Sequence, residues 1–123
     1  MTDNINHPTH YTGRNIGFEC IDIAQSQPFC TGNVIKYLWR YNSKGTPLED
    51  LRKARWYASK AFKMQEAVNL DTSQCKTILR RLLETTSGYE SAAWDGILAN
   101  KWIIVLSALD MMIERTGNDP QAQ

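Results

Sequence analysis

The chain has 123 residues, of which 42% are hydrophobic, and it carries a formal net charge of +1. This length suits one domain with a single core, and the apolar content excludes an intrinsically disordered chain. The nearly neutral balance gives no reason to expect a large basic surface for duplex nucleic acid, because polyanion binding normally shows as an excess of positive charge over the whole domain. We therefore expect one globular domain over residues 1–123.

The first third of the chain predicts an arm followed by two helices. Residues 1–17 lack hydrophobic periodicity and are expected to form an N-terminal arm. A short helix is predicted over 18–25, with Ile21 and Ala24 facing inward, and a longer helix over 32–42. The apolar stripe of the longer helix consists of Val34, Ile35, Leu38 and Trp39.

A stop signal at residues 44–45 separates this helix from the next, since glycine at a helix C-cap commonly follows a basic last turn. Thr46 is then the expected N-cap, with Pro47 at the first helical position and Glu49 completing a capping-box pattern. This helix is expected to run to about residue 68. Its apolar face, at steps of three and four, consists of Leu48, Leu51, Ala54, Ala58 and Phe62.

Two further helices are predicted beyond it, and nothing in the pattern indicates a strand. Residues 71–73 cap a helix that ends at 87–88, and the last helix is expected to run unbroken over 89–115. Because residues 102–113 are apolar on nearly every side, we expect them to lie centrally or between subunits of a homo-oligomer. The prediction is an all-α fold of about four main helices, with residues 72–116 as a C-terminal helical hairpin. The inward residues of these two helices are expected to be Cys75, Ile78, Leu79, Leu82, Leu83, Ala93, Ile97, Ile104, Leu106, Leu109 and Ile113.

Cysteine usage and hydropathy predict a cytoplasmic protein. Cys20, Cys30 and Cys75 are odd in number and form no C-x-x-C pair, so we expect reduced thiols without a disulfide or a metal. The N-terminus is polar and shows no signal peptide. The most apolar run, residues 102–109, is far shorter than the about 20 residues of a membrane span.

Positive charge is concentrated in one aromatic-rich segment. Residues 34–63 hold eight basic side chains and two acidic ones, whereas the rest of the chain holds six basic and eleven acidic side chains. Cations bind phosphate oxygens and aromatic faces accept bases, so this combination favours a nucleotide as the ligand. The candidate phosphate ligands are Lys36, Arg40 and Lys53. The candidate base or sugar contacts are His7, His10, Tyr11, Asn33, Tyr37 and Trp56.

Each of these groups also has a structural interpretation. Asn33, Lys36, Tyr37 and Arg40 share one helix face, which is either the binding surface or a solvated basic face. Two histidines three residues apart can ligate zinc, but no second pair follows, so contacts with a nucleotide or packing of the arm are preferred. Four acids are candidates for sugar hydroxyls or Mg²⁺, with helix-dipole and ion-pair roles as the alternative: Glu19, Asp22, Glu49 and Asp50.

Four blocks of sequence in fixed order carry a resemblance to a known family. They are His7-Pro8-x-His10-Tyr11, then Glu19-Cys20-Ile21-Asp22, then Phe29-x-x-Gly32-Asn33-x-Ile35-Lys36-Tyr37-Leu38-x-Arg40, then Glu49-Asp50-Leu51-x-Lys53-Ala54-x-Trp56-Tyr57. This set resembles a small phage-encoded domain of unknown function. It also looks like the C-terminal part of a nucleotide kinase from a short-tailed coliphage, which acts on deoxynucleoside monophosphates without a P-loop.

The resemblance spans about residues 7–62, and it implies phage origin and a nucleotide-binding part over residues 7–68. Three functions follow as hypotheses. The first is a binding protein in the infected bacterial cell that sequesters a nucleotide or a cyclic-nucleotide immune signal and needs no cofactor. The alternative is a deoxynucleoside monophosphate kinase that requires Mg²⁺; the absence of a G-x-x-x-x-G-K-[ST] motif excludes a conventional P-loop kinase. The third is a structural helical oligomer.

Overall fold

The computed structural model describes residues 14–43 and 45–118. These residues form six helices and no strand, which confirms the predicted all-α class. The helices are α1 (Cys20–Ala24), α2 (Phe29–Arg40), α3 (Pro47–Lys63), α4 (Ser73–Thr85), α5 (Gly88–Leu98) and α6 (Trp102–Gly117).

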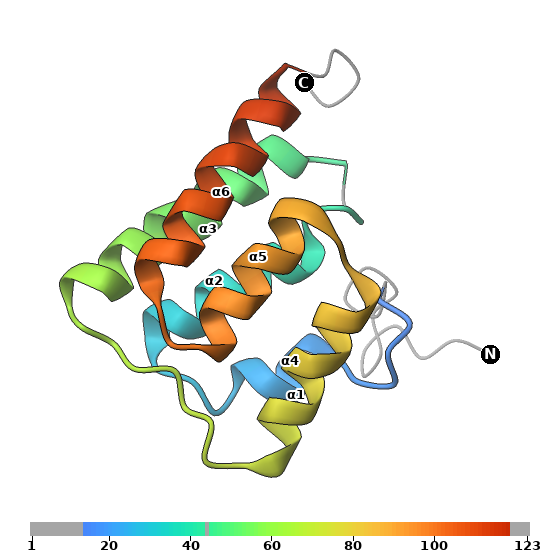
Figure 1. Ribbon diagram of the computed structural model, residues 1–123, viewed down its shortest axis with the longest axis vertical. Helices are drawn as coiled ribbons and strands as arrows, with labels where there is room; N and C mark the ends of the chain where they lie inside the picture. The colour runs from blue at the N-terminus through green and yellow to red at the C-terminus, as the bar shows by residue number, and fades with distance from the viewer. Residues whose placement is uncertain (1–13, 44, 119–123) are drawn as a thin grey trace.

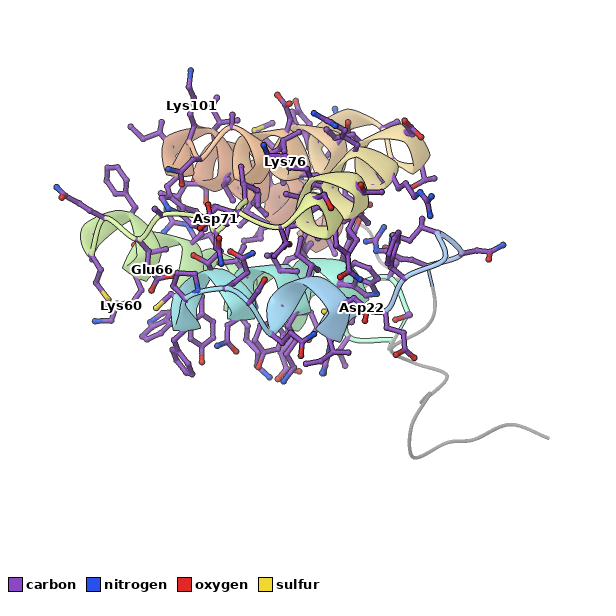
Figure 2. All side chains as sticks on the ribbon, turned by 90° about the horizontal axis from the view of Figure 1, so that it is seen from below. Asp22, Lys60, Glu66, Asp71, Lys76 and Lys101 are labelled. Carbon is purple, nitrogen blue, oxygen red and sulfur yellow. The ribbon has the colours of Figure 1, made fainter. Side chains whose placement is uncertain are left out.

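The six helices make two layers, α1 to α3 and α4 to α6, which Figure 2 shows one above the other. Within the layers α2 packs on α3 and α5 packs on α6, and the α3–α6 contact joins the two pairs (Figure 1). Between the layers the indoles of Trp39 and Trp94 meet edge to face, with ring centroids 6.5 Å apart. One continuous core therefore lies between the layers and places the outer face of α2 and α3 toward solvent.

The predicted apolar stripe of α2 is confirmed, since Val34, Ile35, Leu38 and Trp39 are all buried. The helix begins at Phe29, three residues before the predicted start at residue 32. Its first turn is stabilised by a residue that is distant in the sequence, Glu66. The carboxylate of Glu66 accepts hydrogen bonds from the Cys30 and Thr31 amides and from the Thr31 hydroxyl, so that an anion lies at the positive end of the helix dipole.

Helix α3 ends at Lys63, about five residues before the predicted end. Gln65 adopts φ +55°, and the Glu66 amide donates to the Ala61 carbonyl, which closes the helix as a left-handed residue at the C-terminal end normally does. The expected capping box at its start does not form, because the Thr46 side chain makes no cap hydrogen bond. Leu51, Ala54 and Ala58 are buried as predicted, but Leu48 is only partly buried and Phe62 is exposed.

The prediction of one unbroken helix over 89–115 is wrong. Helix α5 ends at Leu98, Asn100 adopts φ +57°, and α6 begins at Trp102, so the predicted C-terminal hairpin is in fact three helices. The close approach of α5 and α6 requires Gly96, because a Cβ there would lie 2.8 Å from Cγ2 of Val105. The α6 stretch is only partly central: Val105 and Leu109 are buried, whereas Ile103 and Ile104 are exposed.

The other predicted boundaries differ by a few residues. The first helix is shorter than expected, and its inward residues are Cys20 and Ile23, while Ile21 is exposed and its predicted inward orientation is wrong. Thr72 caps α4 as predicted, accepting a hydrogen bond from the Cys75 amide. Helix α4 ends at Thr85, and Ser87 is the N-cap of α5.

Candidate functional site

Three of the predicted cations lie together on the outer face of α2 and α3. The Lys36 and Lys53 ammonium groups and the Arg40 guanidinium carbon are 5.4, 5.5 and 5.5 Å from the centroid of the Tyr37 ring. The short connection between α2 and α3 makes this possible, because it sets the two helices side by side. We call Lys36, Tyr37, Arg40 and Lys53 the basic cluster. A cation over an aromatic face is favourable, so Tyr37 offsets part of the repulsion between the three charges.

Two carboxylates of α3 lie beside the basic cluster. Asp50 is 1% exposed, and its Oδ2 is 3.5 Å from Nε of Arg40. Glu49 is exposed, and its Oε1 is 3.1 Å from Nζ of Lys53, an exposed pair of modest strength. The hydrogen bond from Lys53 to Glu49 and the attraction between their charges raise the pKa of Lys53, which keeps this amine protonated. Lys36 makes no ion pair with any residue of the described ranges 14–43 and 45–118.

Aromatic side chains continue from the basic cluster along the two helices. The Tyr57 ring is nearly parallel to Tyr37, at 11° and 6.0 Å between centroids, and both Phe29 and Trp56 meet Tyr57 edge to face. Tyr37 is therefore enclosed by Tyr57 and the three cations. The open rings are Phe29, which is 74% exposed, and Trp56, which is 57% exposed. The exposed aromatic rings are thus at the ends of the row, and the Lys60 ammonium group lies 5.7 Å from the centroid of the Trp56 ring.

A pocket of about 470 Å³ opens beside the basic cluster, between α1 and α2. Pockets of this size are typical of small-molecule sites. Its wall is mainly apolar, and Lys36 and Asn33 belong to both the pocket and the predicted polar face of α2. Gly32 lines it without a side chain; a Cβ there would lie 3.2 Å from the Ala24 carbonyl oxygen. The pocket is lined by Glu19, Cys20, Ile21, Ala24, Gln25, Gln27, Pro28, Phe29, Gly32, Asn33 and Lys36.

Two lining residues, Gln27 and Asn33, make hydrogen bonds to the backbone that fix the shape of the pocket. The Gln27 amide nitrogen donates to the Asn69 carbonyl and its oxygen accepts from the Asn69 amide, which fixes the connection between α1 and α2. Asn33 Nδ2 donates one of its two N–H groups to the Phe29 carbonyl at 2.9 Å, which leaves the other N–H and the side-chain oxygen for a ligand. The Glu66 carboxylate accepts a hydrogen bond from the Thr31 amide and so fixes the first turn of α2. The pocket is consequently built before any ligand arrives.

The predicted acidic contacts divide into two pairs. Asp22 accepts a hydrogen bond from the Glu19 amide at 2.8 Å, the local role of an acid in the first turn of a helix, and Glu19 lines the pocket. Glu49 and Asp50 lie beside the basic cluster as ion-pair partners of Lys53 and Arg40. Groups of three or more His, Cys, Asp or Glu side chains suited to a metal are absent from the described part of the chain.

The three thiols are unpaired and buried. Cys20 forms part of the pocket wall, and burial raises its pKa to about 12 although Lys36 and Arg14 act in the opposite direction. Burial, together with the nearby Glu66 carboxylate, also raises the pKa of Cys30. Both shifts favour the protonated thiol at neutral pH, which disfavours these cysteines as nucleophiles.

The structure thus brings together five of the predicted site residues: Lys36, Tyr37, Arg40, Lys53 and Asn33. Trp56 lies on the same face, next to Tyr57. His7, His10 and Tyr11 lie outside the described residues. Two residues that the sequence did not single out as contacts, Ile21 and Phe29, form the exposed rim of the pocket. A signal for Phe29 was present, because it opens the block that contains Gly32 and Lys36.

Within the described residues, no helix has the length and apolar content that crossing a bilayer requires. Residues 5–59 match the model of a family described as a protein of unknown function, DUF3310. No curated protein and no solved structure gives a significant match. The expected resemblance to an uncharacterised family is therefore confirmed, and the matched segment contains α1, α2, the whole basic cluster and the pocket, whereas α4 to α6 lie beyond it.

Proposed function

We propose that this protein binds a nucleotide and holds it intact, with the base in the α1–α2 pocket and the phosphate on the basic cluster. One observation carries the proposal: an apolar pocket with an exposed aromatic rim shares Lys36 with a group of three cations. A nucleotide has the same two parts, an apolar planar base and an anionic phosphate, joined by a sugar.

In this arrangement the base enters between Ile21 and Phe29, where Gly32 leaves room against the helix. The side-chain oxygen of Asn33 and the Gln25 amide are the polar groups at hand for the base or sugar. Lys36 contacts the phosphate first, because it is both at the pocket and without a carboxylate partner in the described part of the chain. Lys53 approaches from α3. No metal is needed, since cations of the protein neutralise the phosphate.

The biological setting proposed for this binding follows from the resemblance to a phage-encoded domain. A phage protein that captures a nucleotide or cyclic-nucleotide signal in the cytoplasm of an infected bacterium would weaken antiviral defence. Capture requires only binding, and the pocket beside the basic cluster supports this proposal.

A deoxynucleoside monophosphate kinase is the second candidate, because the four sequence blocks are similar to those of a P-loop-less phage kinase. Phosphoryl transfer needs Mg²⁺ and carboxylates that hold it. Of the two acids beside the basic cluster, Asp50 is buried against Arg40 and Glu49 pairs with Lys53. This shortage of free carboxylates favours capture over transfer.

A helical oligomer without a ligand is the third candidate. The proposed homo-oligomer has a contact surface at Ile103 and Ile104, which are 63% and 39% exposed on α6. Light scattering at micromolar concentration separates a monomer from an oligomer. An oligomer would be compatible with nucleotide binding, so this measurement bears on assembly and not on the ligand.

The test of the proposed function is incubation of the purified chain with ribo-, deoxyribo- and cyclic nucleotides, with and without Mg²⁺, followed by gel filtration. Nucleotide that co-elutes and is recovered unchanged after heat denaturation supports capture. Formation of a di- or triphosphate in the presence of Mg²⁺ and a phosphoryl donor supports the kinase. Failure of every nucleotide to co-elute would refute the proposal.

A further inference from the structure

Arg40 of the basic cluster forms an ion pair with Asp50, and separating this pair would be costly. The Asp50 carboxylate is 1% exposed, and neither its Oδ2 nor Nε of Arg40 has a hydrogen-bond partner within residues 14–43 and 45–118. Removing the counter-charge from a buried carboxylate is strongly unfavourable. Arg40 is therefore held beside Asp50, at 3.5 Å, and cannot swing outward to follow a ligand.

The charge of Lys53 is likewise balanced by a carboxylate, that of Glu49. Its ammonium group lies 3.1 Å from Glu49, and both side chains are substantially exposed. Lys36 is the cation of the cluster without a carboxylate partner in the described part of the chain. Three positive charges and two negative ones leave one unbalanced positive charge, and this charge lies at Lys36, where the cluster meets the pocket.

The two carboxylates also lie on the side of the cluster away from the pocket. Lys36 is one helical turn before Arg40 on α2, and Glu49 and Asp50 lie near the start of α3, beside the end of α2. A ligand anchored in the pocket and on Lys36 would extend any further phosphate groups toward Glu49 and Asp50. Each added phosphate brings negative charge closer to these two carboxylates without meeting another unpaired cation of the cluster.

We propose that Glu49 and Asp50 restrict this site to ligands with a single phosphate group, a monoester or a diester, and select against di- and triphosphates. The inference rests on the proposed nucleotide-binding function and adds a specificity rule to it. Withholding a free cation is a route to specificity, because a second or third phosphate would have to bind beside ion pairs that are already neutral and would find no cation to compensate its charge. Glu49 is the better of the two residues to mutate, since it is exposed and its removal leaves no buried charge without a partner.

The test measures affinity for 5′-monophosphates, 3′,5′-cyclic monophosphates and 5′-triphosphates of each nucleoside by isothermal titration calorimetry without Mg²⁺. For the base that binds best, the wild-type protein should bind the monophosphate or cyclic form at least as tightly as the triphosphate. The Glu49→Gln variant should bind the triphosphate about two- to fivefold more tightly, with a smaller change for the monophosphate. The matched control is Glu84→Gln, an exposed acid on α4 in the other layer, which should change neither affinity.

Two outcomes would overturn the specificity rule while leaving nucleotide binding intact. One is a wild-type preference for the triphosphate of about tenfold or more, as expected if free cations were in excess. The other is an unchanged ratio of triphosphate to monophosphate affinity in Glu49→Gln. If no nucleotide of any class binds the wild-type protein, the proposed function fails and this inference falls with it.

Discussion

Replacing Glu66 with Gln should destabilise the fold at neutral pH, and that effect should shrink in acid. The Glu66 carboxylate accepts from the Thr31 hydroxyl at 2.6 Å, from the Thr31 amide at 2.7 Å and from the Cys30 amide at 3.2 Å. Hydrogen bonds to a charged group contribute about 1.5–3 kcal/mol and neutral ones about 0.5–1.5 kcal/mol. Gln keeps one acceptor oxygen but presents an NH₂ group where the second oxygen was.

The expected loss at pH 7 is about 2–3 kcal/mol, since two charge-assisted bonds weaken and the Cys30 amide loses its acceptor. Burial alone would raise the pKa of Glu66, but the hydrogen bonds from Thr31 and Cys30 outweigh it and hold the pKa below its ordinary value of 4.5. A carboxylate with a lowered folded-state pKa contributes stability that is complete above the ordinary value. That stability is lost as the pH falls through the folded-state pKa.

Urea unfolding followed by far-UV circular dichroism at pH 7, 5 and 3 measures this difference. The gap in unfolding free energy between wild type and Glu66→Gln should be largest at pH 7 and should shrink as the pH falls toward 3. Glu84→Gln serves as the control, because a surface substitution of this kind should change stability by no more than about 0.5 kcal/mol. A gap that is equally large at pH 3, or absent at pH 7, would refute the role assigned to the Glu66 charge.

Three further predictions concern the rest of the fold. Gly96→Ala should cost about 1–3 kcal/mol and lower the Tm, because the new methyl group meets Val105; an unchanged Tm would contradict the close α5–α6 packing. Asn100→Ala should cost about 1–2 kcal/mol by removing the acceptor for the Val68 amide at a residue with positive φ, and a fully stable variant in urea would count against this. Cys20, with its pKa raised to about 12, should resist alkylation at pH 8 until the chain unfolds, and rapid labelling seen by mass spectrometry would show an open pocket wall.

The parts of the fold that the sequence predicted well are those with local causes. Helical spacing alone identifies the buried stripe of α2 and most of that of α3, and Thr72 caps α4 through its own side chain. The grouping of Lys36, Arg40 and Lys53 was predictable for the same reason. Two helices joined by a short connection must lie side by side, and their basic faces then meet.

The helix ends were missed because their causes are not local. Helices α3 and α5 both end at a left-handed residue that is not glycine, Gln65 and Asn100. Long-range hydrogen bonds hold these ends: Asn100 accepts from the Val68 amide, and the Glu66 carbonyl accepts from the Trp102 indole. A pattern of apolar residues contains no trace of such contacts.

The pocket was missed because an amphipathic pattern assigns every large apolar residue to the core. Ile21 was expected to face inward but is exposed, since Cys20 and Ile23 occupy the buried side of the five-residue helix α1, and Phe29 precedes the predicted start of the next helix. Burial of Asp50 was likewise unpredictable from α3 alone, because its counter-charge, Arg40, comes from the neighbouring helix.

The central claim, that a nucleotide phosphate binds at Lys36, is tested most directly by the affinity of the Lys36→Ala variant for the nucleotide that binds the wild type best. Lys101→Ala is the matched control, because Lys101 is an exposed lysine in the opposite layer, as Figure 2 shows. Lys36→Ala should bind about tenfold to a hundredfold more weakly, with helical circular dichroism unchanged, and Lys101→Ala should bind as the wild type does. Equal affinity of Lys36→Ala and wild type would contradict the claim, and the basic cluster would then be a solvated face of α2 and α3.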